Sequence, residues 1–164
     1  GTLELLLTKP LSDWDVILGK FFACFFLVIL SLIPTLIYYF SVYALGNPVG
    51  NIDTAGVMGS YVGLVFLGAV FCSIGIFSSS LTSSQIVSFI LSAFLCYILF
   101  AGFDSLSLVN VWSEKSLFIK QLGLLYHYEA LSKGLIDSRH LVYFASLIGL
   151  LLLFTRIILG ARSW

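Results

Sequence analysis

The sequence predicts an all-α, polytopic membrane protein. Of its 164 residues, 60% are hydrophobic and 10% are charged, and the mean hydropathy is +1.09, whereas soluble domains carry about 25% charged residues. The formal net charge is zero, which argues against a nucleic-acid partner. Four apolar runs are long enough to cross a lipid bilayer as helices. These runs are residues 16–45, 56–80, 86–103 and 141–160.

The first apolar run, residues 16–45, is longer than a membrane is thick. Its 30 residues would extend about 45 Å as a helix, against a hydrocarbon core of roughly 30 Å. Pro34 removes a backbone hydrogen bond near the middle of the run and therefore predicts a helix kink. Lys20 lies near its start, and we expect its long side chain to extend back toward that side of the membrane.

Small residues mark the second run and the turn before it. The turn, GNPVGNID at residues 46–53, is rich in residues that favour tight turns. In the helix that follows, small residues fall on two opposite faces, and such seams let helix backbones approach closely. We therefore expect this helix to pack between two neighbours, and a leucine at Gly59 or Gly75 to push one of them away. The first seam holds Gly56, Gly59 and Gly63, and the second holds Gly68, Cys72, Gly75 and Ser79.

A polar turn, LTSSQ at residues 81–85, joins the second and third runs into a predicted helical hairpin. Residues 104–140 then hold eight of the sixteen charged residues, so this segment is too polar to span the membrane. Within it, Ser113 can cap one short helix and Gly134 can end another. We expect two short helices here, followed by the last span.

Catalysis and metal binding find little support in the sequence. His127 and Glu129 suggest an acid–base pair, but two residues apart on a helix their side chains point about 200° away from each other. The three cysteines lie singly inside apolar runs without a C-x-x-C spacing, which is typical of buried small hydrophobic residues. We therefore predict no catalytic, cofactor-binding or metal-binding residues. The cysteines are Cys24, Cys72 and Cys96.

Two classes of function remain open from composition alone. The chain lacks the phosphate-binding pattern G-x-x-x-x-G-K-[ST], so ATP and Mg²⁺ would have to be bound by a partner chain. One class is a transport subunit driven by a separate ATPase. The other is a passive structural scaffold, for which the lack of charge in the middle of the bilayer would be natural. Binding of an ATPase through residues 1–10 would separate the two.

The first ten residues, GTLELLLTKP, predict a short helix at a membrane interface. Leucines recur at helical spacing beside polar residues such as Glu4. Pro10 ends this helix. Ser12 then stands three residues before Asp15, a spacing with which both side chains can cap the start of the first span.

This arrangement of an interfacial helix, a proline break and a capped span resembles the cytoplasmic coupling element of ABC-2 type transporter permeases. The amino-acid sequence of the first twenty residues is similar to that of the gliding-motility-associated permease subunits. The stretches GNPVGNID and YHYEALSKGLIDSRHLVYF agree with that family. The resemblance extends over essentially all 164 residues.

The resemblance carries expectations about partners and location. It implies a permease subunit, with no enzyme activity of its own, in the bacterial cytoplasmic (inner) membrane. Its partners would be an ATP-binding ABC subunit, which holds the ATP and Mg²⁺, and a second permease subunit, and its role would be linked to gliding motility. The family's six spans imply that this chain starts after the second one. The positions matching the ATPase-coupling element are Gly1, Thr2, Glu4, Leu7, Thr8 and Pro10.

The orientation in the membrane also comes from the resemblance, which places both ends of the chain in the cytoplasm and residues 104–140 outside. The positive-inside rule does not decide it, because Lys and Arg are shared equally between the two sides. One side would hold Lys9, Lys20, Arg156 and Arg162, and the other Lys115, Lys120, Lys133 and Arg139.

Overall fold

The structure is a computed structural model that describes residues 12–108, 114–134 and 137–161. All regular elements in this part of the chain are helical. Four helical segments are long and apolar enough to cross a membrane, namely Asp13–Leu45, Thr54–Leu81, Gln85–Ser107 and Ser138–Ala161. The predicted all-α, polytopic class is therefore confirmed.

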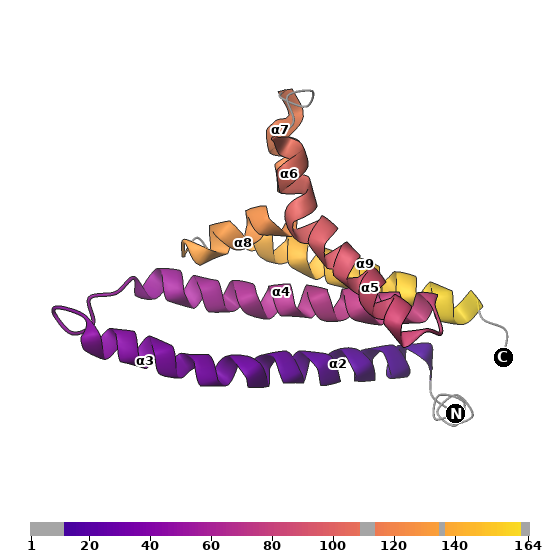
Figure 1. Ribbon diagram of the computed structural model, residues 1–164, viewed down its shortest axis with the longest axis horizontal. Helices are drawn as coiled ribbons and strands as arrows, with labels where there is room; N and C mark the ends of the chain where they lie inside the picture. The colour runs from indigo at the N-terminus through magenta and orange to yellow at the C-terminus, as the bar shows by residue number, and fades with distance from the viewer. Residues whose placement is uncertain (1–11, 109–113, 135–136, 162–164) are drawn as a thin grey trace.

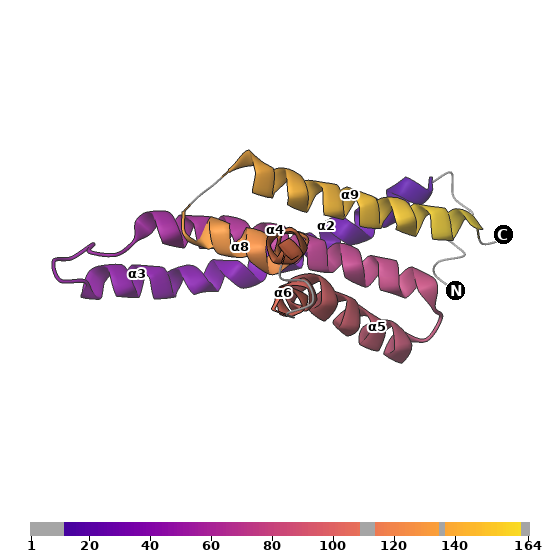
Figure 2. The ribbon, with the colours of Figure 1, turned by 90° about the horizontal axis from the view of Figure 1, so that it is seen from above.

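Helix α4 (Thr54–Leu81) is the centre of the fold. It lies between α2 (Asp13–Leu32) on one side and α8 (Leu124–Ser132) with α9 (Ser138–Ala161) on the other (Figure 1). Figure 2 shows α4 also lying between α9 and α5 (Gln85–Tyr97). Because α4 carries no charged residue, it can be covered by apolar side chains on all these sides.

The core consists of two apolar clusters on opposite sides of α4. The buried residues of the first cluster come from α4, α8 and α9, and those of the second come from α2, α4 and α9. The first holds Leu67, Val70, Ile74, Leu124, Leu131, Phe144 and Leu151, and the second Ile17, Phe21, Ala69, Cys72 and Leu152.

The first span forms as a nearly continuous helix. It begins with a capping box in which Ser12 Oγ accepts from the Asp15 backbone N–H and the Asp15 carboxylate accepts from the Ser12 N–H. Pro34 lies in a 3₁₀ turn, Ile33–Thr35, that joins α2 to α3 (Leu36–Leu45). Figure 1 shows α3 leaving this turn in a slightly different direction from α2. The chain thus accommodates Pro34 by a tighter turn and a gentle bend.

The third span is longer than the apolar run that predicts it. After α5 the chain continues through a π-helical turn, Ile98–Gly102, into α6 (Phe103–Ser107). The helix continues past Asp104, whose carboxylate lies 3.7 Å from the Lys120 ammonium at the end of α7 (Ser116–Gln121). The α6–α7 pair projects away from the bundle (Figure 1).

Two short helices, α7 and α8, follow α6, as the sequence predicts. Gly134 comes directly after the C-cap of α8 and has φ +82°, a backbone conformation that glycine adopts readily. The predicted cap Ser113 lies outside the described residues. Helix α8 does not stand free in the loop, because Leu124 and Leu131 are fully buried in the first core cluster.

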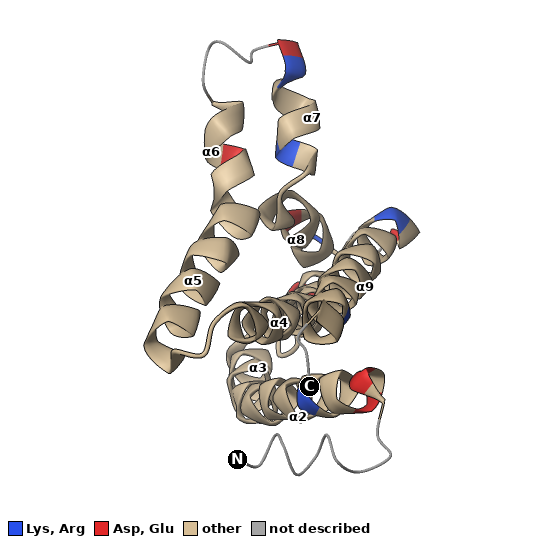
Figure 3. Ribbon diagram, turned by 90° about the vertical axis from the view of Figure 1, so that its right-hand side faces the viewer, with Lys and Arg blue, Asp and Glu red and all other residues tan. Residues whose placement is uncertain are grey.

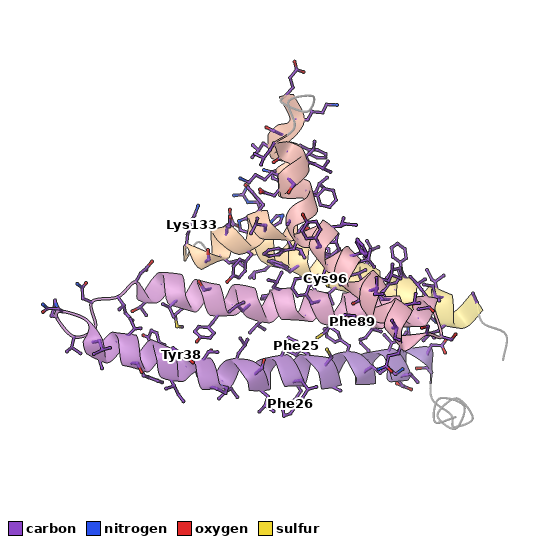
Figure 4. All side chains as sticks on the ribbon, in the orientation of Figure 1. Phe25, Phe26, Tyr38, Phe89, Cys96 and Lys133 are labelled. Carbon is purple, nitrogen blue, oxygen red and sulfur yellow. The ribbon has the colours of Figure 1, made fainter. Side chains whose placement is uncertain are left out.

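Apolar side chains cover much of the surface. Phe26 on α2 is 63% exposed and points away from α4, whereas Phe25 lies on the side that faces α4 (Figure 4). Charged residues are concentrated near helix ends and in α6–α8, and α4 and α5 carry none (Figure 3). Such an apolar belt is expected where side chains contact lipid or other membrane helices.

Candidate functional site

The bundle has two ends, which the connections between helices define. The start of α2 and the end of α9 lie together at one end, which we call the terminal end (Figure 1). The turn at residues 46–53, α8 and the start of α9 lie toward the other, which we call the loop end.

At the terminal end, α2 is fixed both at its first turn and against α9. The capping box satisfies backbone N–H groups at the start of α2. The Arg156 guanidinium of α9 lies 5.4 Å from the centre of the Trp14 ring of α2, within the range of a cation–π interaction. The residues predicted to couple to an ATPase precede α2 directly and lie outside the described residues. They are Gly1, Thr2, Glu4, Leu7, Thr8 and Pro10.

A small cavity of about 60 Å³ lies between α2, α4 and α9 near this end. Lys20, which the sequence places on the starting side of the membrane, is one of its lining residues. Two buried hydroxyl groups along α4 and α9 donate back to their own helices, Ser73 to the Ala69 carbonyl and Thr155 to the Leu151 carbonyl. The cavity is lined by Val16, Ile17, Lys20, Ile76, Ser79, Ser80, Thr155 and Leu159.

The first glycine seam of α4 packs against α8. A Cβ atom added at Gly59 would lie 1.9 Å from the Leu131 carbonyl oxygen, and one added at Gly63 would lie 2.9 Å from the Tyr128 ring. Ordinary contacts begin near 3.4 Å, so α8 sits where it does only because these side chains are absent. At Gly56 an added Cβ would lie 2.4 Å from the Asp53 carboxylate, which caps α4 by accepting from the Gly56 N–H.

The second seam is close to a neighbour at one glycine only. An added Cβ at Gly68 would lie 2.6 Å from Val28 of α2. At Gly75 the nearest atom is the Ser92 hydroxyl of α5 at 3.9 Å, and Gly75 lines an open groove of about 380 Å³ between helices. The expectation that Gly75 permits a close approach therefore differs from this structure, because its nearest neighbour is at ordinary contact distance and the groove beside it, lined by α2 and α4, leaves room for a side chain.

A histidine pair, in which His127 is buried and His140 is half-buried, joins α8 to α9 toward the loop end. His127 Nδ1 lies 2.7 Å from His140 Nδ1, and His127 Nε2 lies 2.8 Å from the Gln121 carbonyl oxygen. The Tyr143 ring stacks on the His127 ring with centroids 3.8 Å apart. The side chain of Tyr143 also donates to the Leu122 carbonyl, so α9 holds both His127 and the end of α7.

Burial of His127 lowers its pKa, and the neighbouring His140 acts in the same direction, while the Gln121 carbonyl partly opposes them. Beside the pair lies an open cavity of about 330 Å³. Its lining residues come from α7, α8 and α9, and they are Phe118, Gln121, Leu122, Tyr126, His127, Arg139, His140 and Tyr143.

The pairing of His127 with His140 is not predicted by the sequence. His127 and Glu129 do diverge, since His127 is 8% exposed and Glu129 is exposed on another side of α8. The true partner lies 13 residues away, beyond the turn at Lys133 and Gly134. The only signal was that both histidines lie close to the start of the last apolar run. Within the described residues no group of three or more His, Cys, Asp or Glu could hold a metal ion.

Comparison with known families decides what kind of membrane protein carries these features. A family model described as ABC-2 family transporter protein matches residues 1–161. The chain belongs to the ABC-2 transporter family. No curated protein and no solved structure matched the chain.

Membership of the ABC-2 family identifies the four spans as part of a transporter's transmembrane subunit. The family domain is the transmembrane subunit of an ABC transporter, which works with an ATP-binding ABC subunit. This ABC-2 chain is accordingly a multi-pass membrane permease, and the match includes the residues that precede α2.

Proposed function

We propose that this ABC-2 permease moves its substrate with energy from ATP that a separate subunit binds with Mg²⁺ and hydrolyses, and that residues 1–10 dock on that subunit. The observation that carries the proposal is the start of α2, which is capped and packed against α9. The capping box at Ser12 and Asp15 and the contact between Arg156 and Trp14 fix the first turn of the span directly after the proposed docking segment. A force applied at residues 1–10 would therefore reach α2 and α9 together.

Further parts of the proposal concern location and partners. We infer that the terminal end faces the cytoplasm of a bacterial cell, that the protein lies in the inner membrane, and that a second permease subunit completes the transporter. The exposed apolar surface supports a bilayer environment and additional helix contacts. None of the residues in the 18-residue hydropathic core of the third span is buried within this chain.

The proposal includes a role linked to gliding motility. Its support is the similarity of the first twenty residues, the turn GNPVGNID and the stretch before the last span to the gliding-motility permease subunit GldF. Deletion of the gene in a gliding bacterium should stop movement on agar, and the intact gene should restore it. Normal gliding in the deletion strain would contradict this role while leaving the transporter assignment intact.

The coupling proposal is tested with the full-length permease and its ATP-binding subunit, produced together. Glu4→Ala should remove charge-assisted hydrogen bonds to the partner, which are about twice as strong as neutral ones, and Pro10→Ala should let the first helix run into the span. Both variants should insert normally in the membrane but lose ATPase association or ATP-dependent transport. Glu114→Ala, which removes an exposed glutamate near α7, is the matched control and should behave like the wild type.

Full complex formation and full ATP-dependent activity in both variants would contradict the coupling role. Residues 1–10 would then be an interfacial anchor. If the wild-type permease also failed to bind any ATP-binding subunit, a structural scaffold would be the better description.

A further inference from the structure

When both rings are neutral, the contact between His127 and His140 leaves one arrangement of protons. The Gln121 carbonyl can only accept a hydrogen bond, so His127 Nε2, 2.8 Å away, must carry a hydrogen. A neutral imidazole has one N–H, so His127 Nδ1 is an acceptor. At 2.7 Å, His140 Nδ1 must therefore donate to it. The two rings form a directed chain that runs from His140 through His127 to Gln121.

This chain tolerates one additional proton but not two. The first can bind His140 Nε2, because His140 Nδ1 still donates to His127 and the bond becomes charge-assisted. The second would have to bind His127 Nδ1, which is already occupied as the acceptor. With both rings doubly protonated, two N–H groups and two positive charges would face each other across 2.7 Å, and the contact could not persist.

We propose that the His127–His140 pair is a proton-binding site that controls docking of α8 on α9, with the second proton releasing the contact. Because the site joins helices of the permease and binds no nucleotide, this inference goes beyond the proposed function and does not rest on it. The released element would be α8, which covers the glycine seam of α4 through Leu131 and Tyr128.

The direction of the response follows from the protonation equilibrium. The pKa of His127 is lowered by burial and by His140, so below about pH 6.5, the ordinary pKa of histidine, the released state binds more protons than the docked state. Uptake of the second proton therefore weakens docking as the pH falls below about 6.5. If the docked His127 takes up no proton and His140 binds its proton equally well in both states, the ratio of released to docked protein rises about tenfold between pH 7.5 and 5.5.

The other charged groups around the pair do not account for this pH dependence. Arg139 stays positive throughout this range and its guanidinium lies 3.0 Å from the Asp137 carboxylate. On α7, Lys120 faces Asp104 of α6 at 3.7 Å, and α4 carries no charged residue. Tyr126 and Tyr143 line the same cavity and bring no carboxylate or ammonium group to it. The response is thus assigned to uptake of a proton by His127, whose pKa burial lowers.

The experiment is hydrogen exchange of the full-length permease in lipid nanodiscs at pH 7.5 and pH 5.5, corrected for the intrinsic effect of pH on exchange. Amides of α8, residues 124–132, should lose protection about tenfold at the lower pH. Amides in the middle of α4 should keep their protection. His127→Gln should remove the pH response, because glutamine does not titrate.

Two further variants keep the test decisive if His127→Gln fails to fold. His140→Gln should also flatten the response, because its amide can rotate to offer a carbonyl to a protonated His127. Tyr143→Phe retains an aromatic ring that can stack on His127 and should respond like the wild type. An unchanged protection of α8 in the wild type at pH 5.5, or a tenfold loss that persists in either glutamine variant, would overturn the proposal.

Discussion

The glycine seam between α4 and α8 gives the sharpest stability prediction, through the single substitution Gly59→Ala. The new Cβ would lie 1.9 Å from the Leu131 carbonyl oxygen, and ordinary contact begins at 3.4 Å. The backbone of α8 would therefore have to retreat by the difference, 3.4 − 1.9 = 1.5 Å. A backbone carbonyl cannot rotate out of the way as a flexible side chain can.

Two opposing effects set the size of the change that Gly59→Ala makes to the free energy of unfolding. Alanine in place of glycine inside a helix stabilises by roughly 0.5–1 kcal/mol. Overpacking a well-filled contact costs about 1–3 kcal/mol, and Gly59 lies at the severe end because the clash is with backbone. The clash should win, so Gly59→Ala is expected to destabilise the permease by about 2–2.5 kcal/mol. For a chain of this size that corresponds to a loss of about 4–10 °C in Tm.

The assay is thermal unfolding of the full-length permease in one detergent, with Gly75→Ala as the matched control. Gly75 lies in the same helix, and its added Cβ would meet nothing closer than 3.9 Å. Gly75→Ala should therefore leave Tm unchanged or raise it, while Gly59→Ala lowers it. Equal effects of the two substitutions, in either direction, would refute the packing of α8 on α4.

The remaining predictions concern topology and the terminal end. Cysteines introduced at Asn51 and Ser83, in a chain without its native cysteines, should differ in whole cells: an impermeant thiol reagent should label the first and not the second, and the reverse pattern would invert the orientation. Ser12→Ala should destabilise the start of the first span by about 1 kcal/mol, measured as a lower Tm, and an unchanged Tm would mean that the cap contributes nothing. Arg156→Gln should lower the free energy of unfolding by about 0.5–1 kcal/mol through loss of the contact with Trp14. The change in Trp14 fluorescence on heating should become smaller, and identical melting curves for variant and wild type would contradict the contact.

Hydropathy predicts the existence of the four spans well, because the bilayer demands long apolar helices whose backbone groups bond within the segment. It predicts their ends less well. The third apolar run stops before Asp104, but the helix continues to Ser107. The Asp104 carboxylate pairs there with Lys120, and no local pattern reveals a partner 16 positions away.

The glycines show the same division between local and distant information. Their spacing predicts which faces of α4 carry small residues and can be approached closely by another helix. This prediction depends only on helix geometry. It does not predict which neighbour fills each face. Gly59 meets α8, a short helix from the polar segment, while Gly75 meets only the Ser92 hydroxyl of α5 at an ordinary contact distance.

The histidine pair could not be predicted for a related reason. Rotation about a helix axis correctly separates His127 from Glu129. It cannot bring His127 to His140, because that contact depends on how α8 and α9 pack against each other and on the packing of Phe144 in the core. Contacts across a turn between two helices are set by tertiary packing.

The measurement that tests the central claim most directly is a cross-link between the permease and its ATP-binding subunit. A photoactivatable reagent attached to Glu4→Cys, in the full-length chain without native cysteines, should join the two proteins, and the yield should change when ATP is added. The same reagent at Asn51→Cys, in the turn at the loop end, should give no such product. A product from the Asn51 position, or none from the Glu4 position in a complex that is otherwise intact, would contradict the account.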